Sequence, residues 1–481
     1  METYIRHVNK SHTLAYSIIA LQELNLCYKY PIIYWNCANL IVDSGSMEDS
    51  SKSTNYDKVS VAVAKMQNNN IKIGLPDINE AERGFVPKAK ENKIIYSLKA
   101  INGIGDEVVE LIINNRPYIS MEDFYERMID TKLVKNSQMI QLIKAGAFER
   151  LSGISRKDLM KDYINKKIFQ PNEKVTFQNF SKMQELGMFP EELKNIVRIK
   201  NFKDYILHEE FFVKNIVDEN KKLPKCGYHD RYFRTDEKST PFLIENFSED
   251  CIVKTSGCNF IISEKKFVKE WKKLIEPLKD WMSKNETVEL YNKKCFDEIW
   301  NKYASGSQSD WYMSSIGAYY EEHSLQYIDL KLYTIDHFSD LSEEPQPYEW
   351  YSRRINGEMK QLPKYKISRI CGTVINNDAQ HYTITLLTDN RDIVNIKLDK
   401  GQYAYYNKRI SQRIDENSDK KKVLETSWLS RGSKLFIHGI RRGDKFCCKT
   451  YKDSIFKHSI YRIDNIYENG KVDVTTDRIK I

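Results

Sequence analysis

Two glycines flanking one apolar residue, Gly103-Ile104-Gly105, give this sequence its clearest candidate for ligand chemistry. Glycine has no Cβ atom, so the backbone can turn tightly there and approach a ligand closely. An amphipathic run begins at Asp106, and the first N–H groups of a helix have no partner inside the helix. Such N–H groups bind phosphate readily. We therefore predict that Lys99, Gly103, Ile104, Gly105 and Asp106 contact a phosphate backbone. The alternative is an ordinary glycine-rich helix start.

A second group of candidates combines basic and aromatic side chains. Lys397, Tyr403, Tyr405, Lys408 and Arg409 follow a series of segments with strand-like alternation. Lysine and arginine neutralise phosphates, and tyrosine rings stack on bases, so these residues could bind a single nucleic-acid strand. The alternative is that the tyrosines are half-buried residues of a barrel and its loops. Both interpretations remain open at the level of sequence.

The N-terminal segments that would position these groups have a helical pattern. Leu14, Ile18 and Leu21 lie on one helix face, and Ser11 is a plausible N-cap for that helix. Pro31 ends the helix and is well placed as the first residue of another one, which covers residues 32–41. The polar residues 43–57 predict a loop. After the glycine hairpin, apolar residues three and four apart again predict a helix.

The C-terminal part changes to an alternation with a period of two residues, which is typical of strands. The predicted strands cover residues 370–374, 382–386, 393–396 and 434–439, and a turn after Arg442 leads into a further one at Phe446. Five short strands with polar turns resemble an OB-fold barrel. Prolines 345, 347 and 363 predict an ordered, non-helical linker before the barrel.

Composition narrows the function classes. The chain has 481 residues, of which 41% are hydrophobic and 30% charged, with a net charge of +8. These values suit a multidomain protein that can bind a polyanion. No run of eighteen apolar residues appears, so we expect no membrane association. Nine widely spaced cysteines fit a reducing cytoplasm better than a disulfide framework. No P-loop is present, which argues against a nucleotide hydrolase.

We expect no metal site in this chain. Cys226, His229, Cys251 and Cys258 are the nearest approach to one. Structural zinc sites use two closely spaced ligand pairs, and the spacing of these four residues is a poor match.

Several motifs, in order, resemble the C-family bacterial replicative DNA polymerases, the DNA polymerase III alpha subunits. The glycine hairpin itself resembles a helix-hairpin-helix, a module that holds nucleic-acid backbone without reading sequence. The other shared segments are Asn9-Lys10-Ser11-His12, Tyr30-Pro31, Pro76-Asp77-Ile78-Asn79 and Leu142-Ile143-Lys144-Ala145-Gly146-Ala147-Phe148. Residues 317–325 are similar to a further family segment, although Ser324 replaces its proline.

The resemblance implies roles for two more groups of residues. In the family, the helix end at Asn9, Lys10, Ser11 and His12 faces the incoming nucleotide, where a lysine would balance triphosphate charge. The family also carries a sliding-clamp peptide, and its closest equivalents here are Gln184, Leu186, Met188 and Phe189. We favour the alternative that these last residues pack in a local core before Pro190.

The residues needed for nucleotidyl transfer are missing. The family holds two metal ions with palm carboxylates, marked by an Asp-x-Asp pair, and this chain contains no Asp-x-Asp. The palm, thumb and phosphoesterase domains would lie upstream. We therefore expect a C-terminal polymerase portion, from a split or truncated gene, that is inactive alone. Mg²⁺ is expected in a partner palm chain, and no cofactor in this one.

The predicted fold class is α+β multidomain. We expect helical fingers (residues 1–66), a helix-hairpin-helix domain (67–160), a mixed connecting region (161–362) and an OB-fold domain (363–481). The expected partners are primer–template DNA, a palm-bearing polymerase subunit and a sliding clamp, in the cytoplasm of a bacterium or a phage-infected cell. The alternatives are a stand-alone DNA-binding accessory protein derived from a polymerase, which would not complement synthesis, and a decayed remnant without a role.

Overall fold

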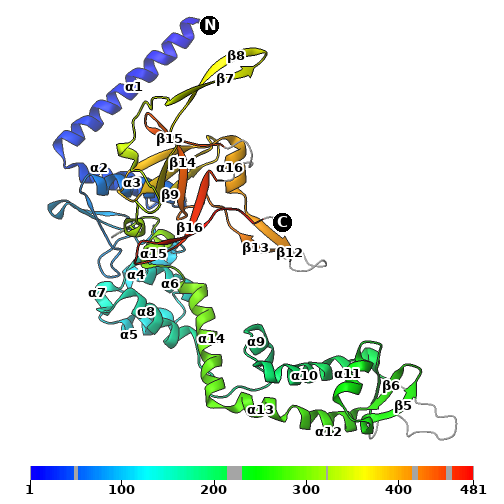
Figure 1. Ribbon diagram of the computed structural model, residues 1–481. Helices are drawn as coiled ribbons and strands as arrows, with labels where there is room; N and C mark the ends of the chain where they lie inside the picture. The colour runs from blue at the N-terminus through cyan, green and yellow to red at the C-terminus, as the bar shows by residue number, and fades with distance from the viewer. Residues whose placement is uncertain are drawn as a thin grey trace. The chain divides into compact units, whose positions relative to one another are not determined.

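The computed structural model describes residues 2–47, 53–213, 230–320, 323–413, 421–450 and 458–479. The chain forms two compact units (Figure 1): unit 1 comprises the residues up to Tyr163 and those from Gly306 onward, and unit 2 is Ile164–Ser305. Both contain helices and sheets, so the predicted α+β class is confirmed. Within the described ranges, no helix combines the length and apolar character needed to cross a bilayer.

Three helices open unit 1, namely α1 (Glu2–Lys29), α2 (Ile32–Ser44) and α3 (Tyr56–Asn68). Pro31 separates α1 from α2, as predicted, and α2 ends at Gly45, whose φ is 65°. The prediction that Ser11 caps the first helix is wrong, because the helix begins at Glu2 and runs through Ser11. No proline or glycine stands between these two residues to interrupt it.

The region after α3 combines a small sheet with short helices. The sheet has the order β1-β3-β2, formed by β1 (Lys72–Gly74), β2 (Val86–Lys88) and β3 (Lys93–Ile95). The helices are α4 (Asp106–Asn114), α5 (Met121–Phe124), α6 (Asn136–Ala145), α7 (Glu149–Ser152) and α8 (Arg156–Tyr163). Val109, Ile112, Phe124 and Phe148 are completely buried among them. This apolar core holds the glycine hairpin in place.

The C-terminal part of unit 1 is a closed five-strand barrel, which confirms the predicted OB-fold. Its order is β9-β10-β11-β15-β14, and β14 pairs back with β9. The strands are β9 (Ser368–Asp378), β10 (Thr383–Thr388), β11 (Ile393–Lys397), β14 (Lys434–Arg442) and β15 (Lys445–Cys448). Helix α16 (Lys400–Asn407) follows β11. Leu386, Val394, Trp428 and Phe446 fill the interior.

Further strands extend the barrel region. β16 (Ile460–Ile466) and β17 (Val472–Thr475) continue the sheet from β14, whereas β12 (Ile410–Arg413) and β13 (Lys421–Glu425) form a separate pair. The predicted linker contains another pair, β7 (Glu349–Ile355) and β8 (Glu358–Lys364). The linker is therefore non-helical, as predicted, but it is a two-stranded ribbon.

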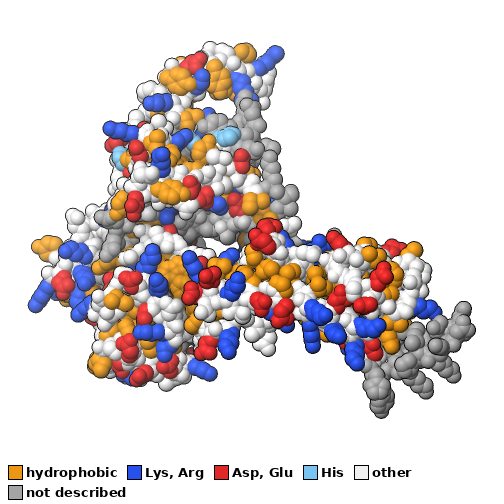
Figure 2. All heavy atoms as spheres, turned by 60° about the horizontal axis from the view of Figure 1, so that its bottom comes forward, with side chains coloured by type: hydrophobic (Ala, Val, Ile, Leu, Met, Phe, Trp, Pro, Cys, Tyr) orange, Lys and Arg blue, Asp and Glu red, His pale blue; other side chains and the backbone are white. Residues whose placement is uncertain are grey.

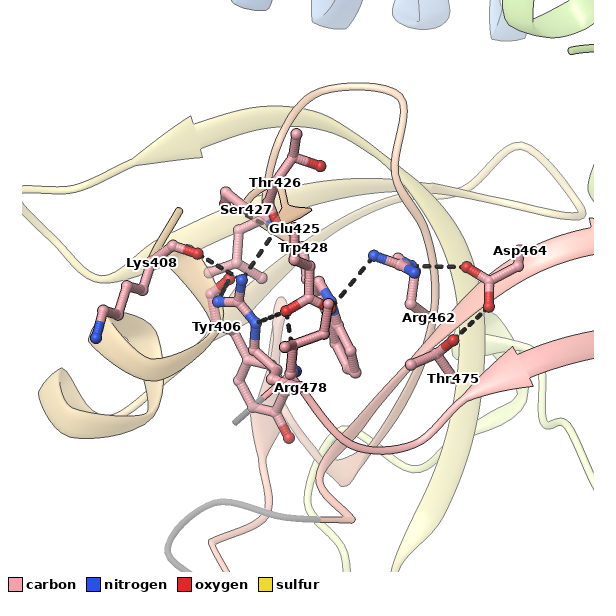
Figure 3. Close-up of polar contacts among 12 residues, drawn as sticks. Tyr406, Lys408, Glu425, Thr426, Ser427, Trp428, Arg462, Asp464, Thr475 and Arg478 are labelled. Atoms are coloured by element: carbon pink, nitrogen blue, oxygen red, sulfur yellow. Dashed lines mark hydrogen bonds and ion pairs between the residues drawn. The ribbon is translucent and has the colours of Figure 1, made fainter. Parts of the chain in front are cut away.

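A buried charged cluster lies beside the barrel core near the C-terminus (Figure 3). The Arg478 side chain is 2% exposed and the Glu425 side chain 4%, and Arg478 Nε donates to Glu425 Oε2 at 2.9 Å. Trp428 Nε1 donates to the other carboxylate oxygen at 2.8 Å. The remaining guanidinium N–H groups donate to main-chain carbonyls of residues 405, 406, 408 and 426. We call Arg478, Glu425, Trp428 and Arg462 the Arg478 cluster.

Helix α15 (Gln308–Ser315) and the residues after it join the two halves of unit 1. Tyr96 of the first half donates its hydroxyl to the Ile316 carbonyl at 2.6 Å. Toward the barrel, Lys434 lies 2.6 Å from Asp310. The helix-hairpin-helix region and the barrel therefore belong to one folded body.

Unit 2 has its own sheet and two apolar clusters. Its sheet has the order β4-β6-β5, formed by β4 (Tyr232–Arg234), β5 (Ile252–Ser256) and β6 (Asn259–Ser263). Its helices are α9 (Phe180–Glu185), α10 (Lys194–Ile206), α11 (Ser239–Asn246), α12 (Glu264–Leu274), α13 (Glu276–Ser283) and α14 (Asn285–Ala304). One cluster centres on Phe202 and Phe267, and the other on Phe180 and Met183.

Candidate nucleic-acid interface

The glycine hairpin stands at the start of α4 with both glycines exposed. Gly103 has a φ of 79°, which is the left-handed conformation that glycine adopts most easily. Between the glycines, Ile104 is 4% exposed and anchors the turn in the core. A Cβ atom at Gly105 would meet nothing within 4 Å, and at Gly103 only Gln141 Cγ at 3.9 Å. The turn therefore presents open backbone to its surroundings.

Gly105 is not required by the fold, unlike Gly103. It is the N-cap of α4, with φ −87° and ψ 169°. Lys135 holds the same position at the start of α6 with φ −78° and ψ 154°, and it carries a full side chain. Neither backbone strain nor packing therefore explains a glycine at position 105. Its smallness leaves open space in front of α4, and in the described part of the chain this N-cap position supplies no side-chain cap to the first N–H groups of the helix.

Ion pairs surround the hairpin. Asp106, the first residue of α4, accepts from Lys99 Nζ at 2.6 Å and lies 2.9 Å from Arg83 Nη2. A carboxylate in the first turn of a helix is favourable to the helix dipole. The Lys99 side chain is only 15% exposed, so its charge is largely engaged with Asp106. Arg83 was not among the predicted residues, because it lies far from the hairpin in sequence.

The hairpin is braced by α15. Asn102 donates its main-chain N–H to the Ser315 carbonyl at 2.8 Å and its side-chain amide to the Ser314 carbonyl at 3.2 Å. On the other side, Ser97 Oγ accepts from the Ala100 N–H at 3.1 Å. These contacts fix the orientation of the turn before any ligand is present.

A second glycine turn, at Gly146, is closed to a ligand. Its φ is 81°, and a Cβ there would lie 2.7 Å from Arg156 Nη2. The Arg156 side chain is 1% exposed, and it contacts Glu149, the Lys144 carbonyl and the Tyr312 hydroxyl. Gly146 therefore serves packing around a buried arginine, and of the two turns only the Gly103–Gly105 turn is open.

The predicted nucleotide-facing residues lie within a helix and not at its start. Asn9, Lys10 and Ser11 are inside α1, and their side chains lie outside the described part of the structure. His12 is exposed, with its ring centroid 5.4 Å from that of Tyr16. The expectation that these residues stand at a helix end is therefore wrong, because α1 begins at Glu2.

The predicted single-strand residues divide into buried and exposed members. Tyr403 is 5% exposed, its ring packs in the barrel core and its hydroxyl bonds to the Asn377 side chain. Tyr405 is half-buried against Tyr406. Lys397, Lys408 and Arg409 are exposed. For Tyr403 the structure shows the buried alternative, since a base cannot stack on a ring that is already covered.

The predicted clamp-binding residues pack in a local core, which is the alternative favoured from the sequence. Met188 is 6% exposed, and Leu186 and Phe189 pack around the same apolar cluster of unit 2. The Phe189 ring lies 5.0 Å from that of Phe180. Gln184 stands at the end of α9, where its amide oxygen accepts from Asn201 at 3.4 Å. In this conformation Met188 and Phe189 stabilise unit 2 and are not free anchors.

Charge and metal ligands add little to the interface. On the face shown in Figure 2, Lys and Arg side chains alternate with Asp and Glu side chains. Among the described residues, no group of three or more His, Cys, Asp or Glu could hold a metal ion. Of the cysteines weighed for zinc, Cys251 is buried and Cys258 exposed. Cys226 and His229 lie outside the described residues.

Comparison with known proteins agrees with this geometry. Residues 70–159 match the family described as "Helix-hairpin-helix motif", which spans the open turn. The predicted resemblance to the C-terminal portion of a C-family DNA polymerase is confirmed.

The relatives are named as polymerases. The chain is 40% identical over 480 residues to the "Probable DNA polymerase YorL" of Bacillus subtilis and to the "DNA-directed DNA polymerase" of Bacillus phage SPbeta. This match covers 98% of the chain and 35% of each relative, so the chain spans about a third of their length. It is also 35% identical over 147 residues to the "DNA polymerase III subunit alpha" of Borreliella burgdorferi, which is 30% of this chain and 12% of that protein.

Proposed function

We propose that this chain is the DNA-holding portion of a C-family DNA polymerase and supports template-directed synthesis together with a separate palm-bearing chain. The observation that carries the proposal is the open Gly103–Gly105 turn, where a glycine that the fold does not require precedes the first N–H groups of α4, which receive no side-chain cap from this position in the described structure. Those N–H groups would bind backbone phosphates of primer–template DNA, a contact that does not depend on base sequence.

The exposed apolar surface of α1 supports the need for a further polypeptide. Leu14, Ile18, Leu21 and Leu24 are between 49% and 71% exposed. Ile19 and Leu26, on other sides of the helix, are about as exposed. An exposed apolar surface of this extent marks a site of interaction with another polypeptide. In the proposed complex, the palm-bearing chain covers α1 and supplies the carboxylates that hold two Mg²⁺ ions.

The DNA-binding part of the proposal is tested with Gly105→Leu. Leucine at this position should fold normally but fill the space in front of α4. Hydrogen bonds to a charged group contribute about 1.5–3 kcal/mol, so loss of one phosphate contact should weaken duplex binding about tenfold or more. Asn114→Leu is the matched control, because it adds the same side chain at the exposed far end of α4. Equal affinity of the two variants would contradict the role of the turn.

The split-polymerase part is tested by complementation. The SPbeta relative, truncated to remove the segment that this chain matches, would serve as the palm donor. We expect primer extension only when both polypeptides are present. Extension by this chain alone would refute the split arrangement. Duplex binding without any complementation would favour the stand-alone accessory protein, and a lack of duplex binding would favour the remnant.

A further inference from the structure

The ribbon β7–β8 has two different faces. In its antiparallel register, Tyr351 is opposite Leu362, and Glu349 is opposite Lys364. Trp350, opposite Pro363, lies on the other face, because successive side chains in a strand point to opposite sides. Tyr351 and Trp350 are therefore neighbouring aromatic residues on opposite faces of the ribbon, and their variants can be compared as a pair.

A groove lies between the ribbon and the barrel within unit 1. Its volume is about 630 Å³, in the range of small-ligand sites. Its lining consists of tyrosines, lysines and a few apolar residues, with no acidic residue: Tyr348, Tyr351, Pro363, Lys364, Tyr365, Lys366, Ile367, Ile440 and Lys449. Arg442 lies over the Tyr365 ring, 5.6 Å from its centroid. Lys364 is paired with Glu349 at 2.8 Å, which leaves Lys366 and Lys449 to set the charge of the groove.

The tyrosines of the groove are unusually exposed. Tyr348, directly before β7, is 61% exposed, and Tyr351, within β7, is 44% exposed. The ribbon pairs with no other strand among the described residues. A lone two-stranded ribbon is only marginally stable in water, so folding alone does not explain aromatic residues held in this way. Aromatic rings beside lysines are instead the combination that binds unpaired nucleotides, through stacking and phosphate neutralisation.

We propose that this groove binds an unpaired segment of DNA, with bases stacked on Tyr348 and Tyr351 and phosphates held by Lys366 and Lys449. The site lies outside the residues 397–409 predicted from sequence. The choice of DNA as the polyanion rests on the proposed function, whereas the stacking surface rests on the exposure of the two tyrosines and the basic lining of the groove.

The test compares Tyr351→Ala with Trp350→Ala in the full chain, using a fluorescent twelve-residue oligothymidylate and an abasic oligomer of the same length. Tyr351→Ala should weaken oligothymidylate binding at least about fivefold, which corresponds to ~1 kcal/mol for one stacked base. It should leave abasic binding unchanged. Trp350→Ala removes a comparably exposed ring that is not among the residues lining the groove, and it should change neither affinity. Lys366→Gln should weaken both, because both oligomers carry phosphates.

Equal affinity of the parent chain and Tyr351→Ala for oligothymidylate would overturn the inference, as would an equal loss for the abasic oligomer. The inference would also be overturned if an acidic peptide bound the groove and neither oligomer did, because the groove would then fit a protein partner. Failure of the proposed function gives a different result. In that case Gly105→Leu does not weaken duplex binding, whereas the single-strand affinities of the groove variants can still be measured.

Discussion

The Arg478 cluster should contribute strongly to the stability of unit 1, and Arg478→Met tests this directly. Methionine keeps most of the apolar volume of the side chain but removes the guanidinium. Glu425 would then lose its nearest cation, at 2.9 Å, inside a site where its side chain is 4% exposed. Four main-chain carbonyls would lose donors at the same time.

The expected loss in the free energy of unfolding depends on the groups that still contact Glu425 in the variant. Removing one partner of a buried ion pair costs about 3–5 kcal/mol, since the other charge stays buried. Trp428 still donates to Glu425 at 2.8 Å, and Arg462 lies 3.5 Å from the same oxygen (Figure 3). We therefore expect the lower limit, about 3 kcal/mol, for Arg478→Met. Glu425→Gln on the Arg478→Met background should cost less than on the parent, with a coupling of about 1–3 kcal/mol.

The assay is urea unfolding of the full chain, followed by tryptophan fluorescence, with the transitions of the two units analysed separately. Arg231→Met is the matched control, because Arg231 pairs with Glu264 at 2.6 Å in unit 2 while its side chain is 58% exposed. An exposed pair is worth at most about 1 kcal/mol. If Arg478→Met destabilises unit 1 no more than Arg231→Met destabilises unit 2, the reasoning about burial is refuted.

Three further predictions concern the hairpin and the histidines. Gly103→Ala should lower the free energy of unfolding by about 1 kcal/mol, because the backbone at position 103 is in the left-handed conformation. Gly105→Ala should not lower it, and thermal unfolding of the two variants checks both expectations. Burial lowers the pKa of His323 to about 3 and that of His438 to about 4, with Arg369 adding to the shift at His438. Both folded-state pKa values lie below that of an unfolded histidine, which is about 6.5. Unit 1 should therefore lose stability as the pH falls from 6.5 toward 4. The loss should be at most about 1.4 kcal/mol per pH unit for each histidine. His438→Gln, with an amide oxygen that can still accept from Arg369, should reduce that loss when urea midpoints at pH 7 and pH 5 are compared; an unchanged loss would exclude His438 as a contributor.

The barrel was predictable because its strands are amphipathic. In β11, Val394 and Ile396 are buried while Asn395 and Lys397 are exposed, and this alternation is visible in the sequence. The hairpin was predictable for a different reason, since Gly103 marks a left-handed backbone position that local sequence encodes, and Gly105 leaves the space beside it open. Both features depend mainly on neighbours within a few residues.

Burial that depends on distant packing could not be read in the same way. Tyr403 and Arg409 look alike as surface candidates, but Asn377 and the barrel interior cover only the tyrosine. Arg156 has no special sequence context, and its burial becomes evident only when Tyr312, from the other half of unit 1, is placed against it. The face of the ribbon on which Tyr351 lies likewise depends on the pairing of β7 with β8, which the sequence of a proline-rich linker does not predict.

The contacts made by α15 link the two DNA-binding proposals physically. Asn102 next to the open turn is held by Ser314 and Ser315, and Lys434 of the barrel is held by Asp310 on the same helix. α15 therefore contacts the turn and β14, and β14 also contributes Ile440 to the groove, which leaves little freedom for one site to move without the other. The turn and the groove would therefore hold duplex and unpaired DNA in a fixed relation, so that a palm docked on α1 meets a primer end already positioned by this chain.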